Sequence, residues 1–155
     1  MTAPNDRATA YHEAGHAVAA LVLGRSITKV SIRPNRERLG ICAFGKAITR
    51  PSKDWIEQEI LISLAGMAAE ARLTGVYARD SAERDLRYVR DLAVQRSGHR
   101  QADRLERRLL AKTEYLLADE GHWEAVERIA TELLSRGEIS GRAARHLFEL
   151  SCRTT

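Results

Sequence analysis

The sequence contains few aromatic residues and few cysteines. Aromatic side chains make up 5% of the 155 residues. This argues against recognition of single-stranded nucleic acid, because bases stack on aromatic platforms interleaved with basic residues. The two cysteines, Cys42 and Cys152, form no C-x-x-C pair, so neither a zinc knuckle nor a disulfide scaffold is indicated. We therefore expect a protein of a reducing compartment, the cytoplasm.

Long apolar runs and targeting signals are also absent from the sequence. The longest apolar run, Ala17–Leu23, is far shorter than the ~20 residues that cross a bilayer. The N-terminus lacks a basic segment followed by an apolar segment, so no secretory signal is indicated. We expect no membrane anchor in this chain.

Proline is scarce, and the composition is suited to one globular domain over residues 1–155. The chain has three prolines and 44% hydrophobic residues, enough to bury a core without disulfides. The net charge of +4 permits weak attraction to acidic partners. However, charged residues of both signs make up 30% of the chain, which is typical of a solvated surface. For the arginine-rich stretch 84–108, ion pairing on helix surfaces is favoured over binding of nucleic acid or an acidic partner.

The strongest chemical pattern is the stretch from His12 to His16, which reads His-Glu-Ala-Gly-His. Two histidines four apart on a helix lie on one face, so their imidazoles can converge on one tetrahedral zinc ion. The apolar residues 17–23 that follow predict a buried helix. Unpaired buried polar groups cost on the order of 1–3 kcal/mol each, and a metal would satisfy both histidines at once. The alternative is a chance match on an amphipathic helix.

Glu13 follows the first histidine and is the candidate general base. Because Glu13 is adjacent to His12 in sequence, its carboxylate is poorly placed to bind the same metal ion as a further ligand. Its carboxylate can instead reach the attacking water and take its proton, as in a metalloprotease. Catalytic zinc normally takes three protein ligands and leaves one position open, so the chain must supply a third ligand from elsewhere.

Two segments after the motif have the pattern of β-strands. In residues 26–33 aliphatic side chains alternate with polar ones up to Pro34, and residues 39–45 form a second such segment. We expect a small antiparallel ribbon beside the motif helix. Its edge strand could pair with an extended substrate backbone. A purely structural ribbon is the alternative.

Helices are expected on either side of this ribbon. The motif helix should be capped by Asn5 or Asp6 and end at Gly24. After the ribbon, apolar residues at helical spacing predict a long helix from a Ser52 cap to Gly75.

Glu70 lies at the flank of the apolar stripe of this long helix. Contact with solvent or with an arginine is the ordinary explanation for a carboxylate in this position. Alternatively, Glu70 could accept a hydrogen bond from a metal-ligating histidine, since such histidines usually donate their free N–H to a carboxylate or carbonyl. Glu70 is therefore a candidate supporting residue and not a candidate ligand.

Asp85 is the best-placed candidate for the third ligand. A further helix, for which Asp80 or Ser81 can serve as the cap, carries Leu86, Val89 and other apolar residues on one face, and Asp85 falls inside the same arc. A carboxylate on a buried face must be paired. A metal is one partner, and the neighbouring arginines are the other.

The remaining chain is expected to be helical packing. Apolar spacing predicts helices over residues 102–117, 123–134 and 142–150, with a break at Gly121 and an end at Gly137. The predicted fold class is thus α+β and mainly α-helical. It combines a zincin-like motif helix, a small antiparallel β ribbon and a C-terminal helical bundle. We divide the single domain into a catalytic core at 1–98 and a helical tail at 99–155.

Taken together, four segments resemble the peptidase domain of the FtsH family of AAA+ zinc proteases. The segments occur in the family's order and are residues 10–17, residues 30–34 with Leu39-Gly40, residues 64–70, and residues 82–86. Such a set is more specific than the histidine motif alone. The resemblance implies that His12, His16 and Asp85 hold one zinc ion per chain and that Glu13 is the base.

The chain departs from that family in lacking a G-x-x-x-x-G-K-[ST] phosphate loop and a membrane span. The resemblance therefore implies a stand-alone peptidase domain, with a separate AAA+ ATPase and a homo-oligomer left open as partners. We expect an ATP-independent zinc endopeptidase that cleaves unfolded or flexible polypeptide. The alternative is a catalytically inactive zinc-binding module for protein interaction. A basic nucleic-acid-binding protein is disfavoured by the scarcity of aromatics.

Overall fold

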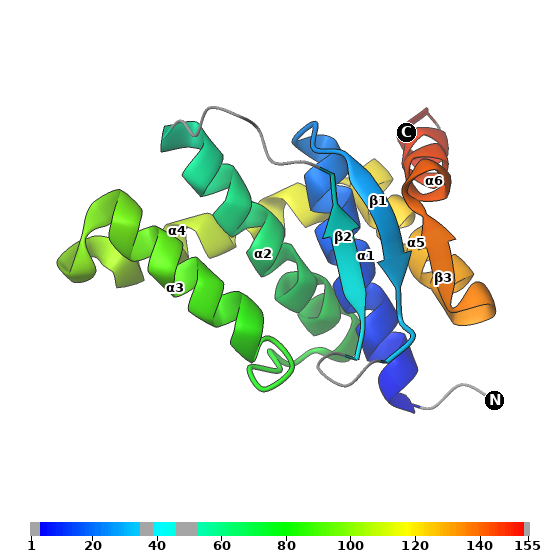
Figure 1. The fold of residues 1–155 in the computed structure, drawn as a ribbon, viewed down its shortest axis with the longest axis horizontal. Helices are drawn as coiled ribbons and strands as arrows, with labels where there is room; N and C mark the ends of the chain where they lie inside the picture. Colours follow the sequence, from blue (N-terminus) through cyan, green and yellow to red (C-terminus); the bar gives the residue numbers. More distant parts are fainter. Residues whose placement is uncertain (1–3, 35–38, 46–52, 154–155) are drawn as a thin grey trace.

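The computed structural model describes residues 4–34, 39–45 and 53–153. Within these residues the protein is mainly helical, with one small antiparallel sheet (Figure 1). The predicted α+β class is therefore confirmed. Helix α1 runs through the centre, with the sheet on one side and helices α2 and α5 on others.

Helix α1 (Pro4–Val22) carries the histidine motif and is buried for most of its length. Its small alanines let neighbouring elements approach closely all round, as the apolar sequence predicted. The chain leaves the helix at Gly24, whose φ of +78° lies in the left-handed region that glycine adopts without strain. The predicted caps were wrong, because Asn5 and Asp6 lie inside the first turn.

The sheet has the strand order β2-β1-β3. Strands β1 (Ile27–Ser31) and β2 (Ile41–Phe44) form the predicted antiparallel ribbon, with Val30 opposite Cys42. Strand β3 (Glu138–Ser140) joins the other edge of β1 and was not predicted. Three residues are too few to show an alternating pattern, so only packing places this strand. Strand β2 remains an edge of the sheet.

Helices α2 (Lys53–Thr74) and α3 (Glu83–Ser97) cover the side of α1 that carries the histidines. The predicted cap Ser52 lies outside the described residues, whereas the predicted stop at Gly75 is confirmed by its φ of +84°. The predicted caps of α3 were wrong. Ala82 occupies the N-cap position without a side-chain hydrogen bond.

Three further helices complete the fold: α4 (His99–Ala118), α5 (Glu120–Arg136) and α6 (Gly141–Arg153). Helix α4 packs on α2 and α3, and α5 packs on α1 and α6, so the C-terminal helices form a bundle with the N-terminal ones. The predicted helix break at Gly121 was wrong. Asp119 caps α5 by accepting a hydrogen bond from the His122 N–H, and Gly121 lies in the first turn.

A search of the described helices finds none with the length and apolar character needed to cross a bilayer.

Candidate metal centre

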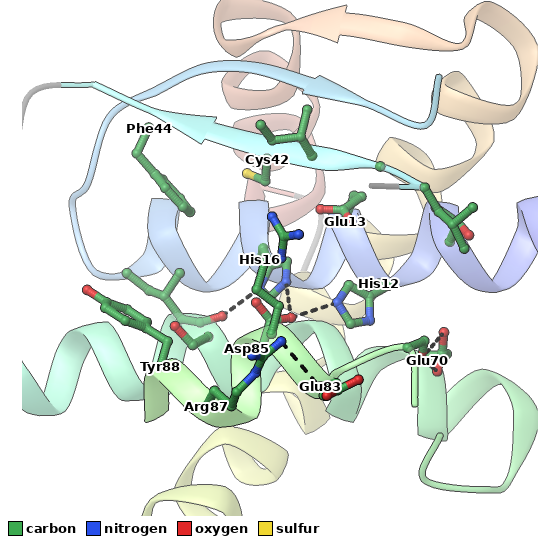
Figure 2. A pocket seen from close by; sticks show the side chains of 18 of the residues that line it. His12, Glu13, His16, Cys42, Phe44, Glu70, Glu83, Asp85, Arg87 and Tyr88 are labelled. Atoms are coloured by element: carbon green, nitrogen blue, oxygen red, sulfur yellow. Dashed lines mark hydrogen bonds and ion pairs between the residues drawn. The ribbon is translucent and has the colours of Figure 1, made fainter. Parts of the chain in front are cut away.

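A cleft of about 570 Å³ opens between β2, α1 and α3 (Figure 2). The candidate residues from the sequence, namely His12, Glu13, His16, Glu70 and Asp85, all line it. Strand β2 forms one wall and the first turns of α3 form the other. The structure thus brings residues from three helices to one cleft.

His12 and His16 lie on the same face of α1. Their ring centroids are 4.8 Å apart and the rings meet edge to face at 81°. Both side chains are buried, as is Glu13 between them in sequence. The i,i+4 spacing on a helix therefore produces the expected pair of imidazoles on one side of the cleft.

Asp85 meets both histidines from α3 (Figure 2). Its Oδ2 lies 2.9 Å from Nε2 of His12 and 3.1 Å from Nε2 of His16. In a tetrahedral zinc site with bonds of about 2.0–2.1 Å, ligand atoms lie about 3.3 Å apart. One atom from each of the three side chains lies within 4.8 Å of the others, a grouping that could hold a metal ion.

The hydrogen bonds of His16 indicate that this centre needs a cation. Its Nδ1 donates to the carbonyl of Ile62 at 2.8 Å, so in the neutral ring Nε2 carries a lone pair. That lone pair faces the Asp85 carboxylate, which also only accepts. Two acceptors at this distance require a positive charge between them, supplied by a metal ion or by a proton on the ring.

The pKa shifts of His16 and Asp85 also indicate a positive charge at this centre. Burial alone would lower the pKa of His16, but the charge and hydrogen bond of Asp85 outweigh it and raise that pKa to about 9. Burial alone would raise the pKa of Asp85, yet His16 and His12 hold it well below its usual range. A cation at this point is therefore strongly favoured.

Glu70 is buried, but in this structure it does not bond to a histidine. Its carboxylate accepts hydrogen bonds from the Ser81 hydroxyl at 3.0 and 3.4 Å. Among the described residues, the buried Nδ1 of His12 has no hydrogen-bond partner. Because Ser81 belongs to the turn before α3, Glu70 anchors the turn that presents Asp85.

Gly66 of α2 lies beside the Nε2 atoms of the two imidazoles. A Cβ at this position would come within 2.5 Å of Nε2 of His16 and 2.7 Å of Nε2 of His12. Gly15 of α1 likewise leaves room for α2, because a Cβ there would lie 2.4 Å from the Ala65 carbonyl oxygen. The sequence analysis assigned no role to either glycine. The available signal was a glycine in a helix interior, which costs helix stability and so usually has a packing reason.

Glu13 lies between α1 and β2 at the edge of the same cleft (Figure 2). Gly40 packs against it so closely that a Cβ would come within 3.0 Å of the Glu13 Cγ. Cys42 of β2 is also buried here, and burial together with the charge of Glu13 raises its pKa well above the usual thiol value. The Cys42 thiol is therefore neutral, which leaves Glu13 as the candidate base on this wall.

Four further residues that line the cleft, Arg25, Phe44, Glu59 and Tyr88, form a connected group. Arg25 forms an ion pair with Glu59, and its guanidinium lies 4.7 Å from the ring centroid of Phe44. The Tyr88 hydroxyl donates to Glu59 at 3.2 Å. These contacts join the loop after α1, β2, α2 and α3. The sequence analysis missed this group because its members are scattered along the chain.

Comparisons with known proteins identify the family of this chain. A model of peptidase family M41 matches residues 1–98. A relative that is 36% identical over 97 residues is the ATP-dependent zinc metalloprotease FtsH of Syntrophotalea carbinolica. That match covers 60% of this chain but 15% of the relative, so the chain spans a small part of the protein it resembles. The predicted resemblance to the FtsH peptidase domain is confirmed, and the chain belongs to peptidase family M41.

Proposed function

We propose that this protein is a zinc-dependent endopeptidase. The observation that carries the proposal is the meeting of His12, His16 and Asp85 in an open cleft beside the buried carboxylate of Glu13. The fold remains in our proposal a zincin-like single domain over residues 1–155, with its catalytic core at 1–98. The name of the relative, a zinc metalloprotease, supports zinc as the metal.

The metal would be held by Nε2 of His12, Nε2 of His16 and a carboxylate oxygen of Asp85. The donor set fits, because two imidazoles and one carboxylate leave a tetrahedral ion one open position. The hydrogen bond from His16 Nδ1 to Ile62 fixes that ring with Nε2 toward the centre. When bound, zinc acts as a Lewis acid that polarises the scissile carbonyl and acidifies the attacking water.

Glu13 supplies the proton transfers. Its carboxylate takes a proton from the attacking water as the oxygen bonds to the carbonyl carbon. It then passes the proton to the nitrogen of the leaving amine as the peptide bond breaks. Its burial limits competing water contacts, and its position in the lining of the cleft supports this role.

Strand β2 provides the natural place for the substrate backbone. It lines the cleft through Ile41, Cys42 and Phe44, and its outer edge is unpaired among the described residues. An extended segment can add to such an edge through main-chain hydrogen bonds, which places its carbonyl in register with the centre. The substrate is therefore an unfolded or flexible polypeptide segment.

Metal analysis together with a Glu13→Gln variant tests the proposal. We expect about one zinc per chain in both proteins. Loss of the base should reduce peptide hydrolysis by about 10²–10⁴-fold, because the variant cannot accept the proton. Glu114→Gln, which removes a carboxylate outside the cleft, is the matched control and should retain activity.

If wild type binds zinc and cleaves no flexible peptide, the alternative of an inactive zinc-binding interaction module replaces the proposal. If the Glu13→Gln variant turns over at the wild-type rate, Glu13 has no place in the mechanism. A cytoplasmic location, a separate AAA+ ATPase partner and a homo-oligomeric state stay predictions.

A further inference from the structure

The α3–α4 corner carries a second hollow that the peptidase cleft does not use. It has a volume of about 260 Å³, and it shares no residue with the cleft. In Figure 1 the corner lies at the end of the molecule opposite the sheet. We call it the arginine hollow, and it is lined by Arg96, Ser97, Gln101, Arg104, Leu105 and Arg108.

Positive charge in the arginine hollow exceeds the negative charge that faces it. Arg108 and Arg96 both approach Oε1 of Glu57, at 2.9 and 4.0 Å. Arg104 is exposed and has no ion pair with any described residue. Three guanidinium groups thus face one carboxylate, and the hollow has an unbalanced positive charge.

Nearby acids do not neutralise this charge. Asp103 and Glu106 of α4 turn to the other side, where both contact Arg90 of α3 at 2.5 and 3.4 Å. The first turn of α4 contains no acidic residue that could neutralise the arginines.

A buried donor in the arginine hollow also lacks an acceptor. The Nε of Arg96 is buried and makes no hydrogen bond with the described part of the chain. An unsatisfied buried N–H is unfavourable, so a rotation of the Arg96 side chain that presents this N–H to an anion in the hollow would gain both a hydrogen bond and charge neutralisation. Gln101 adds an amide to the same wall.

The chemistry of these groups selects the class of ligand. Planar guanidinium groups bind phosphate and carboxylate through paired N–H donors. A small hollow with three of them suits one compact anion with several oxygens, namely phosphate. No aromatic residue lines the hollow, so it offers no platform for stacking a nucleic-acid base.

We propose that the arginine hollow binds a phosphate group. The group is either free phosphate or a phosphoryl group on a polypeptide side chain, since both present the same oxygens. This site is independent of the proposed peptidase function, because Arg96 lies eleven residues beyond Asp85 on α3, about 16 Å along the helix axis.

Calorimetric titration of the zinc-loaded full chain with inorganic phosphate at low ionic strength tests the site. We expect Arg104→Gln to weaken phosphate binding about tenfold or more, because it removes a charge-assisted hydrogen bond. Arg145→Gln removes an exposed arginine of α6 and is the matched control, with wild-type affinity expected. Circular dichroism and peptidase activity of both variants should match wild type.

A phosphoserine peptide and its glutamate counterpart then separate the two sources. Tighter binding of the phosphoserine peptide than of free phosphate, lost in Arg104→Gln, identifies a phosphorylated polypeptide. Equal binding of the phosphoserine peptide and of free phosphate identifies free phosphate as the ligand. Phosphate affinity that is the same in wild type and Arg104→Gln overturns the proposal. It also fails if single-stranded oligonucleotides bind with an affinity that rises with length while inorganic phosphate does not bind.

Discussion

At the scale of single residues, the candidate metal centre depends on Gly66 as well as on His12, His16 and Asp85. Gly66 occupies the point of α2 that faces both imidazoles, where even a methyl group would lie 2.5 Å from a ligand nitrogen. Real Cβ atoms do not come this close to another heavy atom. The absence of a side chain therefore sets how near α2 can come to the histidines of α1.

We predict that Gly66→Ala weakens zinc binding while leaving the helix intact. Alanine is favoured over glycine within a helix by about 1 kcal/mol, so α2 itself should not be destabilised. The added methyl must displace the imidazoles, and we expect an effect similar to that of losing a supporting hydrogen bond, about 10–100-fold in zinc affinity. Competition with a chelating dye would measure it. If the variant binds zinc with wild-type affinity, Gly66 has no role in the metal site.

A second prediction separates the roles of Asp85 and Glu70. Asp85→Ala removes a ligand and should release most of the zinc. Glu70→Ala removes the acceptor of the Ser81 hydroxyl, which loosens the turn before α3, so we expect a loss of about 10–100-fold in affinity or activity. Zinc content and affinity of both variants should be measured together with circular dichroism. If Asp85→Ala retains its zinc and Glu70→Ala loses it, the two roles are reversed.

At the scale of elements, the ion pair of Arg25 and Glu59 links the walls of the cleft. Glu59 of α2 also accepts from Tyr88 of α3, and Arg25 stacks on Phe44 of β2. Both members of the pair are largely buried, with side-chain exposures of 18% and 8%. This group therefore links β2 with α2 and α3 at the cleft.

We predict that Glu59→Gln destabilises the protein by about 3–5 kcal/mol, because it leaves the buried charge of Arg25 without its partner. The double variant Arg25→Gln/Glu59→Gln should recover part of this loss. Urea unfolding followed by circular dichroism measures both. Glu132→Gln breaks the exposed pair with Arg136 on α5 and is the control, with an expected cost of at most about 0.5 kcal/mol. An equal cost at the two positions would contradict the buried-pair account.

At the scale of the whole molecule, the proposed function requires the cleft to bind its substrate as an extended chain. Strand β2 lines one cleft between the sheet and α3 together with the candidate base Glu13 and the candidate ligands His12, His16 and Asp85. A folded substrate keeps its segments paired and packed, and ordinary stabilities of about 5–15 kcal/mol rarely expose them. No phosphate loop occurs in these 155 residues, so this chain contains no recognised means of coupling ATP hydrolysis to unfolding.

Cleavage by this chain should therefore depend on the fold of the substrate and not on ATP. We predict that a substrate protein whose fold depends on disulfides is degraded much faster in its reduced, unfolded form than in its native form. Addition of ATP and magnesium should not change either rate. Gel-based time courses of the degradation of both forms provide the measurement, and the Glu13→Gln variant is the negative control. Equal degradation of native and unfolded substrate would rule out the extended-chain requirement.

Local sequence patterns predict the parts of the site that lie within one helix. His12 and His16 share a face because the spacing is local, and Glu13 follows from the same motif. The helix ends at Gly24 and Gly75 were predictable because a left-handed φ favours glycine wherever it occurs. Hydrophobic periodicity likewise predicted the mainly helical α+β class.

Only the tertiary structure decided which distant groups meet. Asp85 lies 73 residues from His12 in sequence, and helical periodicity placed it on a buried face without naming its partner. The same holds for Glu70, which accepts from Ser81 and not from an arginine or a histidine, and for Gly66 beside the imidazole Nε2 atoms. Spacing along the chain describes which way a side chain points relative to its own helix. Contacts between helices depend on how these pack, and that is decided by the shapes of all the residues in the core.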